Sequence, residues 1–187
     1  ISMRMFQVLL DAGAAKMLLP SSLATSLAKE AFREELIAYL HVCDSRLEER
    51  CAVVLMHLSA QEIRAWSECV RMPNEVRDFS EIFSELNQLI EKSTNQSDDA
   101  YQAIDVLAWF NRADVWRKPD RGYAELNLAR EIGLIVTPLI KAMQQAQSLN
   151  TAEIIASIPA GERSNGERIR SAVDAARLFA ITSALSS

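Results

Sequence analysis

Glycine, proline and cysteine are all scarce in this chain of 187 residues, which holds five glycines, five prolines and three cysteines. Few residues therefore mark tight turns, and no segment sustains the alternation of β-branched residues typical of strands. The cysteines are odd in number and lie in apolar helical patterns, which argues against a disulfide framework and favours buried thiols in a reducing compartment. They are Cys43, Cys51 and Cys69.

Long apolar runs and positive net charge are missing as well. The longest strongly apolar run without a charge covers only residues 132–140, whereas a helix needs roughly 20 residues to cross a bilayer. Arg4 and Asp11 interrupt the opening apolar stretch, so no signal peptide is expected. A net charge of −5 and an isoelectric point near 5.2 oppose nucleic-acid binding through bulk positive charge.

Motifs of common enzymes are also absent, because no Gly-x-Ser-x-Gly elbow, phosphate loop or dinucleotide glycine pattern occurs. The ligand-like side chains lie in one stretch, but their spacing matches no zinc pattern, and positions 41 and 43 of a helix point apart. We expect buried thiols and half-buried imidazoles there, and we assign no catalytic residue, metal ligand or cofactor. These side chains are His41, Cys43, Cys51 and His57.

What is present is a set of amphipathic helical patterns, and 49% of the residues are hydrophobic, so an all-α protein with a sizeable core is predicted. The polar stretch 92–99 predicts a boundary between a helical bridging or interaction region, residues 1–95, and a C-terminal four-helix bundle, residues 96–187. The first half is expected to pack on this bundle. Its predicted helices cover about 3–12, 21–43, 44–58, 59–70 with a Ser59/Glu62 capping box, and 73–90.

Four helices are expected in the second half. Ser97 is the predicted cap of the first, and Asp120 that of a long second helix that runs to about Leu149 with a kink at Pro138. A short third helix is predicted to start at Asn150, which has Glu153 three residues on, and the last at Ser164, which has Glu167. The chain ends within this last helical pattern and starts at Ile1, so we expect a fragment of a longer protein.

The turn at residues 115–121, Val-Trp-Arg-Lys-Pro-Asp-Arg, puts a tryptophan beside three cations. If the indole points outward, it can insert at the depth of the lipid headgroups of an anionic membrane, while the cations bind the lipid phosphates. The alternative is an ordinary loop whose Trp116 folds back on the core. A second cluster opens the last helix, and whether the clusters meet depends on the path of the long helix. The candidate membrane-binding residues are Trp116, Arg117, Lys118, Arg121, Arg163, Arg168 and Arg170.

Two segments of the second half resemble those of a known protein family. They are residues Trp116 to Tyr123, between two predicted helices, and Asn165 to Arg170, at the start of the last predicted helix. Over about residues 98–187 the chain resembles the C-terminal membrane-localisation region of the patatin-like phospholipase effectors delivered by bacterial type III secretion. The likeness lies in architecture and loop character. It implies that a helical bridging region leads into a four-helix bundle whose loops meet phosphoinositide-containing inner leaflets.

The resemblance also implies a separate N-terminal patatin domain with a Ser-Asp dyad, which is absent here, and activation by ubiquitin as a protein partner. A secretion chaperone and a place in the host cytoplasm, peripheral at the plasma membrane, would follow for such a virulence protein; otherwise a cytoplasmic location is expected. The expected function is thus a non-catalytic targeting fragment that binds anionic membranes and no nucleic acid. The alternatives are a helical protein-interaction adaptor without a membrane role, and an enzyme that uses zinc at the His/Cys cluster.

Overall fold

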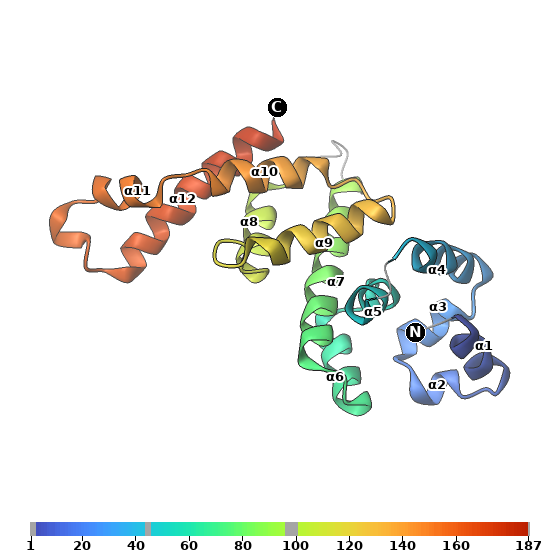
Figure 1. The fold of residues 1–187 in the computed structure, drawn as a ribbon. Helices are drawn as coiled ribbons and strands as arrows, with labels where there is room; N and C mark the ends of the chain where they lie inside the picture. Colours follow the sequence, from blue (N-terminus) through green and yellow to red (C-terminus); the bar gives the residue numbers. More distant parts are fainter. Residues whose placement is uncertain (1–2, 44–45, 96–100, 187) are drawn as a thin grey trace. The chain divides into compact units, whose positions relative to one another are not determined.

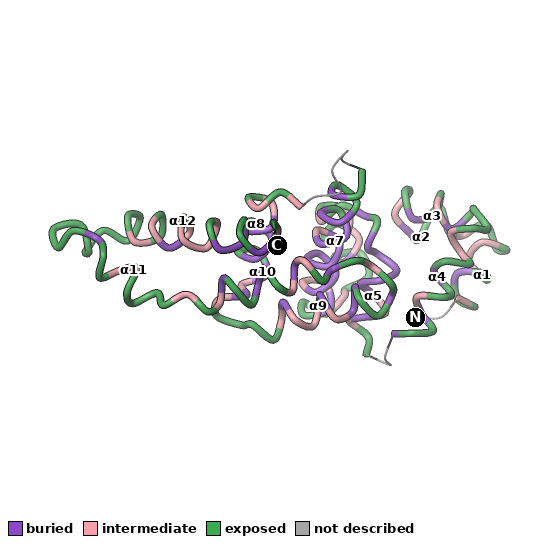
Figure 2. The backbone as a smooth tube through the Cα atoms, turned by 90° about the horizontal axis from the view of Figure 1, so that it is seen from above, coloured by how far each residue is buried: buried purple, intermediate pink, exposed green. Residues whose placement is uncertain are grey.

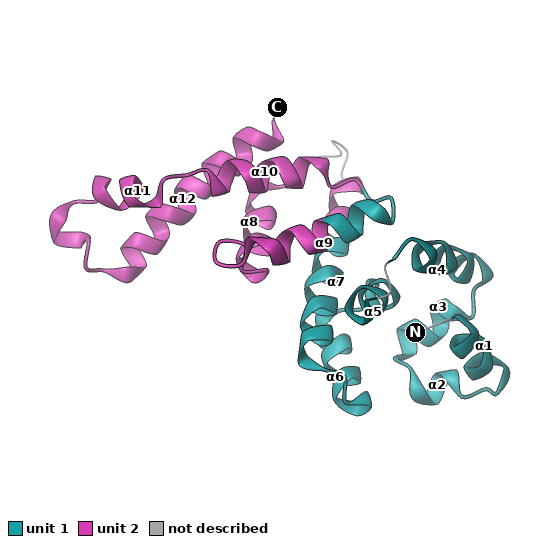
Figure 3. Cartoon of the chain, viewed as in Figure 1, with its two compact units in different colours: residues 1–88, 127–134 teal, residues 89–126, 135–187 magenta. Residues whose placement is uncertain are grey.

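The computed structural model describes residues 3–43, 46–95 and 101–186, and within these ranges the chain is helical throughout (Figure 1). Twelve α-helices and one 3-10 turn occur there and no strand, so the all-α prediction is confirmed. The predicted helix start at Asp44 and the predicted cap Ser97 lie outside the described residues. The chain divides into two compact units, coloured separately in Figure 3: Ile1–Gln88 with Asn127–Leu134, and Leu89–Leu126 with Ile135–Ser187.

Unit 1 contains the first helices of the chain, and α5 supplies much of its core. Every residue from Cys51 to Met56 is buried, which a helix surrounded by neighbours requires (Figure 2). Along the chain, contacts link α1 to α2, α2 to α3, α3 to α4, and α4 to α5. The helices are α1 Met3–Asp11, α2 Ala15–Leu18, α3 Ser21–Leu27, α4 Glu30–Val42, α5 Leu47–Leu55, α6 Ala60–Val70 and α7 Asn74–Thr94, whose last turns belong to unit 2.

Unit 2 is organised around the last helix. α12 packs mainly on α10 and also contacts α8 and α11, and Val173, Ala180, Ile181 and Ala184 form its buried side. The small residues among these four let helix axes approach closely. The elements are α8 Ala103–Arg112, α9 Pro119–Glu131, α10 Thr137–Gln147, α11 Thr151–Ser157, the 3-10 turn η1 Ala160–Glu162 and α12 Gly166–Leu185; the end of α9 belongs to unit 1.

Two long helices predicted from the sequence are each broken in two. Instead of one helix over 21–43, α3 ends at Leu27 and α4 starts at Glu30, with Lys29 in an extended conformation between them. Instead of one helix over 120–149, α9 ends at Glu131 and α10 starts at Thr137.

The second break has a clear physical cause. Gly133 adopts φ +90°, and its N–H and that of Leu134 donate to the carbonyls of Arg130 and Ala129, which is a Schellman motif. Pro138 then lies in the first turn of α10, where its missing N–H costs nothing. The proline therefore helps to start a new helix and does not kink an old one.

Side-chain caps mark two other helix starts as predicted, whereas the predicted cap Asp120 lies inside the first turn of α9, which begins at Pro119. The Ser59/Glu62 capping box of α6 is confirmed in both directions, with Glu62 N–H to Ser59 Oγ at 3.2 Å and Ser59 N–H to Glu62 Oε2 at 2.9 Å. Asn150 Oδ1 accepts from Ala152 N–H at 3.1 Å and so caps α11. The start of α12 differs by one position, because Asn165 provides the cap instead of Ser164.

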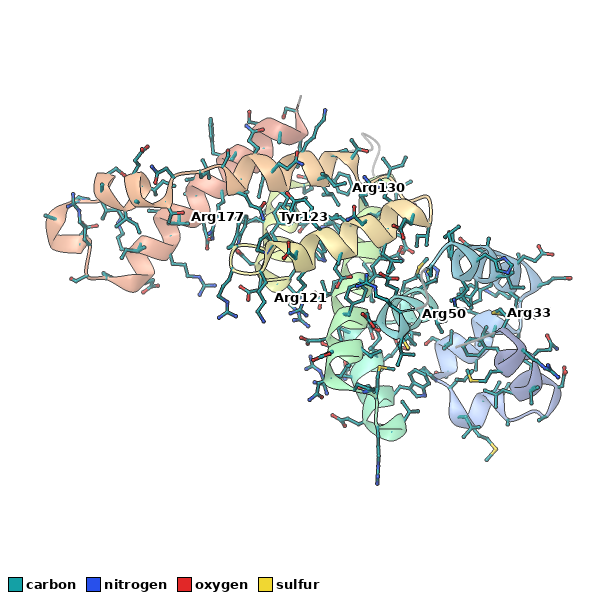
Figure 4. The ribbon with its side chains drawn as sticks, viewed as in Figure 1. Arg33, Arg50, Arg121, Tyr123, Arg130 and Arg177 are labelled. Atoms are coloured by element: carbon teal, nitrogen blue, oxygen red, sulfur yellow. The ribbon has the colours of Figure 1, made fainter. Side chains whose placement is uncertain are left out.

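Arginine side chains cap the C-terminal ends of two helices in unit 1. The guanidinium of Arg33 donates to the carbonyl of Leu27, the last residue of α3, and that of Arg50 donates to the Leu40 carbonyl near the end of α4 (Figure 4). In each case the arginine comes from the following helix. A cation at a helix C-terminus satisfies free carbonyls and complements the helix dipole, so these arginines are structural.

Gly133→Ala is expected to lower the free energy of unfolding by about 1–2 kcal/mol, since an L-residue is strained at this left-handed backbone position. The matched control is Gly161→Ala, because a Cβ at Gly161 meets no atom within 4 Å and its φ is ordinary. The control should change stability by less than about 0.5 kcal/mol. Urea unfolding followed by circular dichroism measures both, and equal stability of the two variants would contradict the Schellman assignment.

Candidate membrane-binding site

The basic turn joins α8 to α9 and is shaped by its backbone. α8 ends in a Schellman motif in which Asp114 has φ +57°, and the N–H groups of Asp114 and Val115 donate to the carbonyls of Asn111 and Phe110. The Asp114 carbonyl then accepts from the Lys118 N–H at 2.9 Å. Val115 is fully buried, and α9 passes so close that a Cβ on Gly122 would lie 2.5 Å from Val115 Cγ1.

Trp116 is half-buried, which corrects the sequence-based expectation of an indole held outward. Its ring meets Phe110 edge to face at 5.8 Å between centroids, and its Nε1–H donates to Asn111 Oδ1 at 2.5 Å. The guanidinium carbon of Arg177 lies 3.9 Å from the ring centroid. The indole thus folds back as the ordinary-loop alternative predicted, because its ring, its N–H and its face all find partners within unit 2.

The cations of this turn differ in their availability. Arg117 pairs with Asp114 at 2.7 Å, yet its side chain is 77% exposed. Lys118 is exposed, and its ammonium has no side-chain partner within the described residues. Arg121 is half-buried at the start of α9 (Figure 4). Lys118 and Arg117 are therefore the cations of the turn that are most accessible to an anionic surface.

The second cluster is largely occupied with internal contacts. Arg163 donates to the carbonyls of Ala156 and Ile158 at 2.6 and 2.8 Å, and so repeats the arginine cap at the end of α11. Arg168 pairs with Glu162 at 2.8 Å. Arg170 is 80% exposed and lies 3.8 Å from Asp174, which is a loose pair.

The structure also places the two clusters relative to each other within unit 2. Arg177 of α12 lies on Trp116, whereas Arg168 and Arg170 are nine and seven residues nearer the start of α12. At 1.5 Å per residue, this is about 13 and 10 Å along the helix. With 3.6 residues per turn, Arg170 lies on the same side of α12 as Arg177 about two turns away, whereas Arg168 lies on the opposite side, so the clusters do not converge on one point. Figure 1 shows the course of α12.

Arg177 is the functional candidate that sequence reasoning missed. Its guanidinium borders a pocket of about 300 Å³ whose walls come from the basic turn, the end of α10 and the start of α11. Burial lowers the pKa of Arg177, and the nearby Asp174 carboxylate partly offsets this effect. The lining residues are Val115, Trp116, Pro119, Ala146, Gln147, Leu149, Thr151 and Arg177.

The thiols Cys43 and Cys51 of the His/Cys stretch are buried as expected, whereas His41 and His57 are both exposed, which corrects the expectation of half-buried imidazoles. Burial raises the pKa of the Cys51 thiol, which favours its unreactive protonated form. His57 meets Phe32 edge to face at 5.6 Å. In the part of the chain that the structure describes, no three His, Cys, Asp or Glu side chains are placed to hold a metal ion.

Unit 1 carries an apolar groove of about 370 Å³ between the segment 17–21 and α6. Trp66 forms one wall and donates its indole N–H to the Leu18 carbonyl at 2.9 Å, while Met17 is 86% exposed at the rim. The sequence analysis did not locate this groove, because its walls lie more than 40 residues apart in the chain.

None of the described helices is both long and apolar enough to cross a membrane. Comparison of the chain with family models, with curated proteins and with solved structures gives no match. The resemblance to phospholipase effectors therefore remains a prediction that is based on the sequence alone.

Replacing Arg163 by Ala should loosen α11, since two helix carbonyls lose a charged donor. A loss of about 1 kcal/mol corresponds to roughly fivefold faster amide exchange in residues 151–158. The control is Arg170→Ala, which removes a similar charge but only a 3.8 Å pair. Hydrogen–deuterium exchange measures both variants, and unchanged exchange in Arg163→Ala would mean that this arginine has no capping role.

Proposed function

We propose that this chain is a targeting module that binds anionic membrane surfaces, including phosphoinositide-containing ones, through the cations of the basic turn and of the start of α12. In this proposal residues 96–187 act as a four-helix bundle, and residues 1–95 act as a bridging region. The main support for this proposal is Lys118, which is exposed and has no side-chain partner in the described part of the chain. It lies beside the exposed Arg117, although the net charge of the protein is −5.

The half-buried Trp116 changes how such binding would work. An indole that is stacked on Phe110 and covered by Arg177 contributes little apolar insertion, so attraction between cations and phosphates has to supply the affinity. Each lysine or arginine near an anionic surface is worth about 1 kcal/mol, which gives a reversible attachment that salt weakens. The exposed pair of Arg117 with Asp114 costs little to exchange for a phosphate, because surface ion pairs are weak.

The wider biological setting is proposed from the resemblance alone. A targeting module of this kind would serve a patatin-like phospholipase whose catalytic domain lies outside this chain, with ubiquitin as activator. It would act peripherally at the host plasma membrane after secretion by a bacterium.

Arg117→Ala combined with Lys118→Ala should reduce binding to vesicles that contain phosphatidylinositol phosphate by about thirtyfold at low salt, because two cations are lost. Cosedimentation with these vesicles and with neutral phosphatidylcholine vesicles measures the effect. The matched control, Lys16→Ala with Lys141→Ala, removes the same charge from two other exposed lysines and should bind as wild type does. Equal loss in both double variants would show that net charge, not this turn, governs binding.

A helical protein-interaction adaptor is the alternative function, and the groove of unit 1 favours it. Grooves with aromatic and methionine walls accept the apolar face of an amphipathic helix. Here Trp66, Met17 and Leu18 would provide such walls. The vesicle experiment separates the two functions, because an adaptor without a membrane role binds neither neutral nor anionic vesicles.

A further inference from the structure

The side chain of Arg177 has more hydrogen-bonding capacity than its surroundings use. A guanidinium carries five N–H donors, yet within the described residues this one makes a single long hydrogen bond, from Nη1 to Asp174 Oδ1 at 3.4 Å. Only 19% of the side chain is exposed, but none of its unpaired nitrogens is fully buried, so these donors are open to water or to a ligand. A half-buried guanidinium whose donors remain open to solvent can exchange water for an oxyanion.

The charge around Arg177 is also incompletely balanced. Asp174 is the acidic partner of both Arg177 and Arg170, at 3.4 and 3.8 Å, so one carboxylate serves two cations on the same helix. Arg177 is the only charged residue among the described residues that line the pocket. The pocket therefore presents a cation and no carboxylate to a ligand, which favours an anion.

The stack on Trp116 orients the guanidinium. With the indole against its face, the hydrogen-bonding edge of a planar guanidinium is held in a fixed direction, which suits bidentate contact with an oxyanion. Asn111 holds the indole through its N–H, and Gln147 is held by hydrogen bonds with the Val115 carbonyl at 3.2 Å and with the Tyr123 hydroxyl at 3.3 Å. Two walls of the pocket are thus positioned before any ligand binds.

We infer that the pocket beside Arg177 binds a phosphate monoester. We take a lipid headgroup as the source of this phosphate, and this part of the inference rests on the proposed membrane function. A phosphate monoester carries a charge of about −1.5 to −2 at pH 7 and three terminal oxygens. These match the guanidinium edge and the Thr151 hydroxyl, which lies on the α11 side of the pocket. A phosphodiester has one charge and fewer free oxygens, so it fits the same walls less well.

The test compares vesicles that contain phosphatidic acid, a monoester, with phosphatidylglycerol vesicles, which present a diester, at matched surface charge. Wild type should prefer phosphatidic acid by about tenfold, since the third terminal oxygen and the extra negative charge of the monoester add one charged hydrogen bond. Arg177→Lys should lose this preference, because lysine keeps the charge without the planar fork. The matched control, Arg170→Lys, changes an arginine that shares Asp174 but lies outside the lining, and should keep the preference.

A second variant and a soluble probe keep the inference testable if Arg177→Lys unfolds. Thr151→Val alters an exposed residue and should weaken phosphatidic acid binding about threefold. Glycerol 3-phosphate in solution should shift the indole N–H signal of Trp116 in NMR spectra of the wild type.

Equal binding to both lipids, with no NMR shift, would overturn the pocket assignment and leave the proposed membrane function intact. An NMR shift without binding to either vesicle would instead identify a soluble phosphate monoester as the ligand and overturn the membrane function. Preference for phosphatidic acid that survives in both pocket variants would show that monoester recognition occurs elsewhere and would also overturn the inference.

Discussion

The stack of Phe110, Trp116 and Arg177 is the interaction on which the organisation of unit 2 around its candidate site depends. It joins the end of α8, the basic turn and the middle of α12, which are separated by up to 67 residues in the chain. An aromatic pair contributes about 0.5–1.5 kcal/mol beyond area burial, and a partly desolvated cation–π contact up to about 2 kcal/mol. Together they are a sizeable share of the free energy that keeps a small domain folded.

The half-buried indole and the backbone of the turn together leave two cations exposed. Because Trp116 turns back and Asp114 ends α8 in a left-handed conformation, Arg117 and Lys118 project from the turn. Elsewhere the arginines close helix ends, as Arg33, Arg50 and Arg163 do. Three arginines thus serve as helix caps, whereas Arg117 and Lys118 extend from a turn between two helices.

Local patterns predicted much of the secondary structure, since capping depends on neighbours in sequence. Ser59 with Glu62 and Asn150 with Glu153 start helices as expected. The break after α9 was also encoded locally, because Gly133 and Pro138 have the spacing of a helix end and a helix start, but the apolar run across them favoured one helix. The partner of Trp116 was not predictable, because periodicity shows that a helix has an inner face without showing which side chain of a distant helix meets it.

The position of Arg177 over Trp116 is tested most directly by NMR of the arginine side chains. Protons above an indole face experience its ring current, so the Arg177 side-chain signals should lie upfield of those of the other arginines and return to their range in Trp116→Leu. Ordinary shifts for Arg177 in the folded wild type would contradict the stack, and with it the account of the turn, its exposed cations and the pocket.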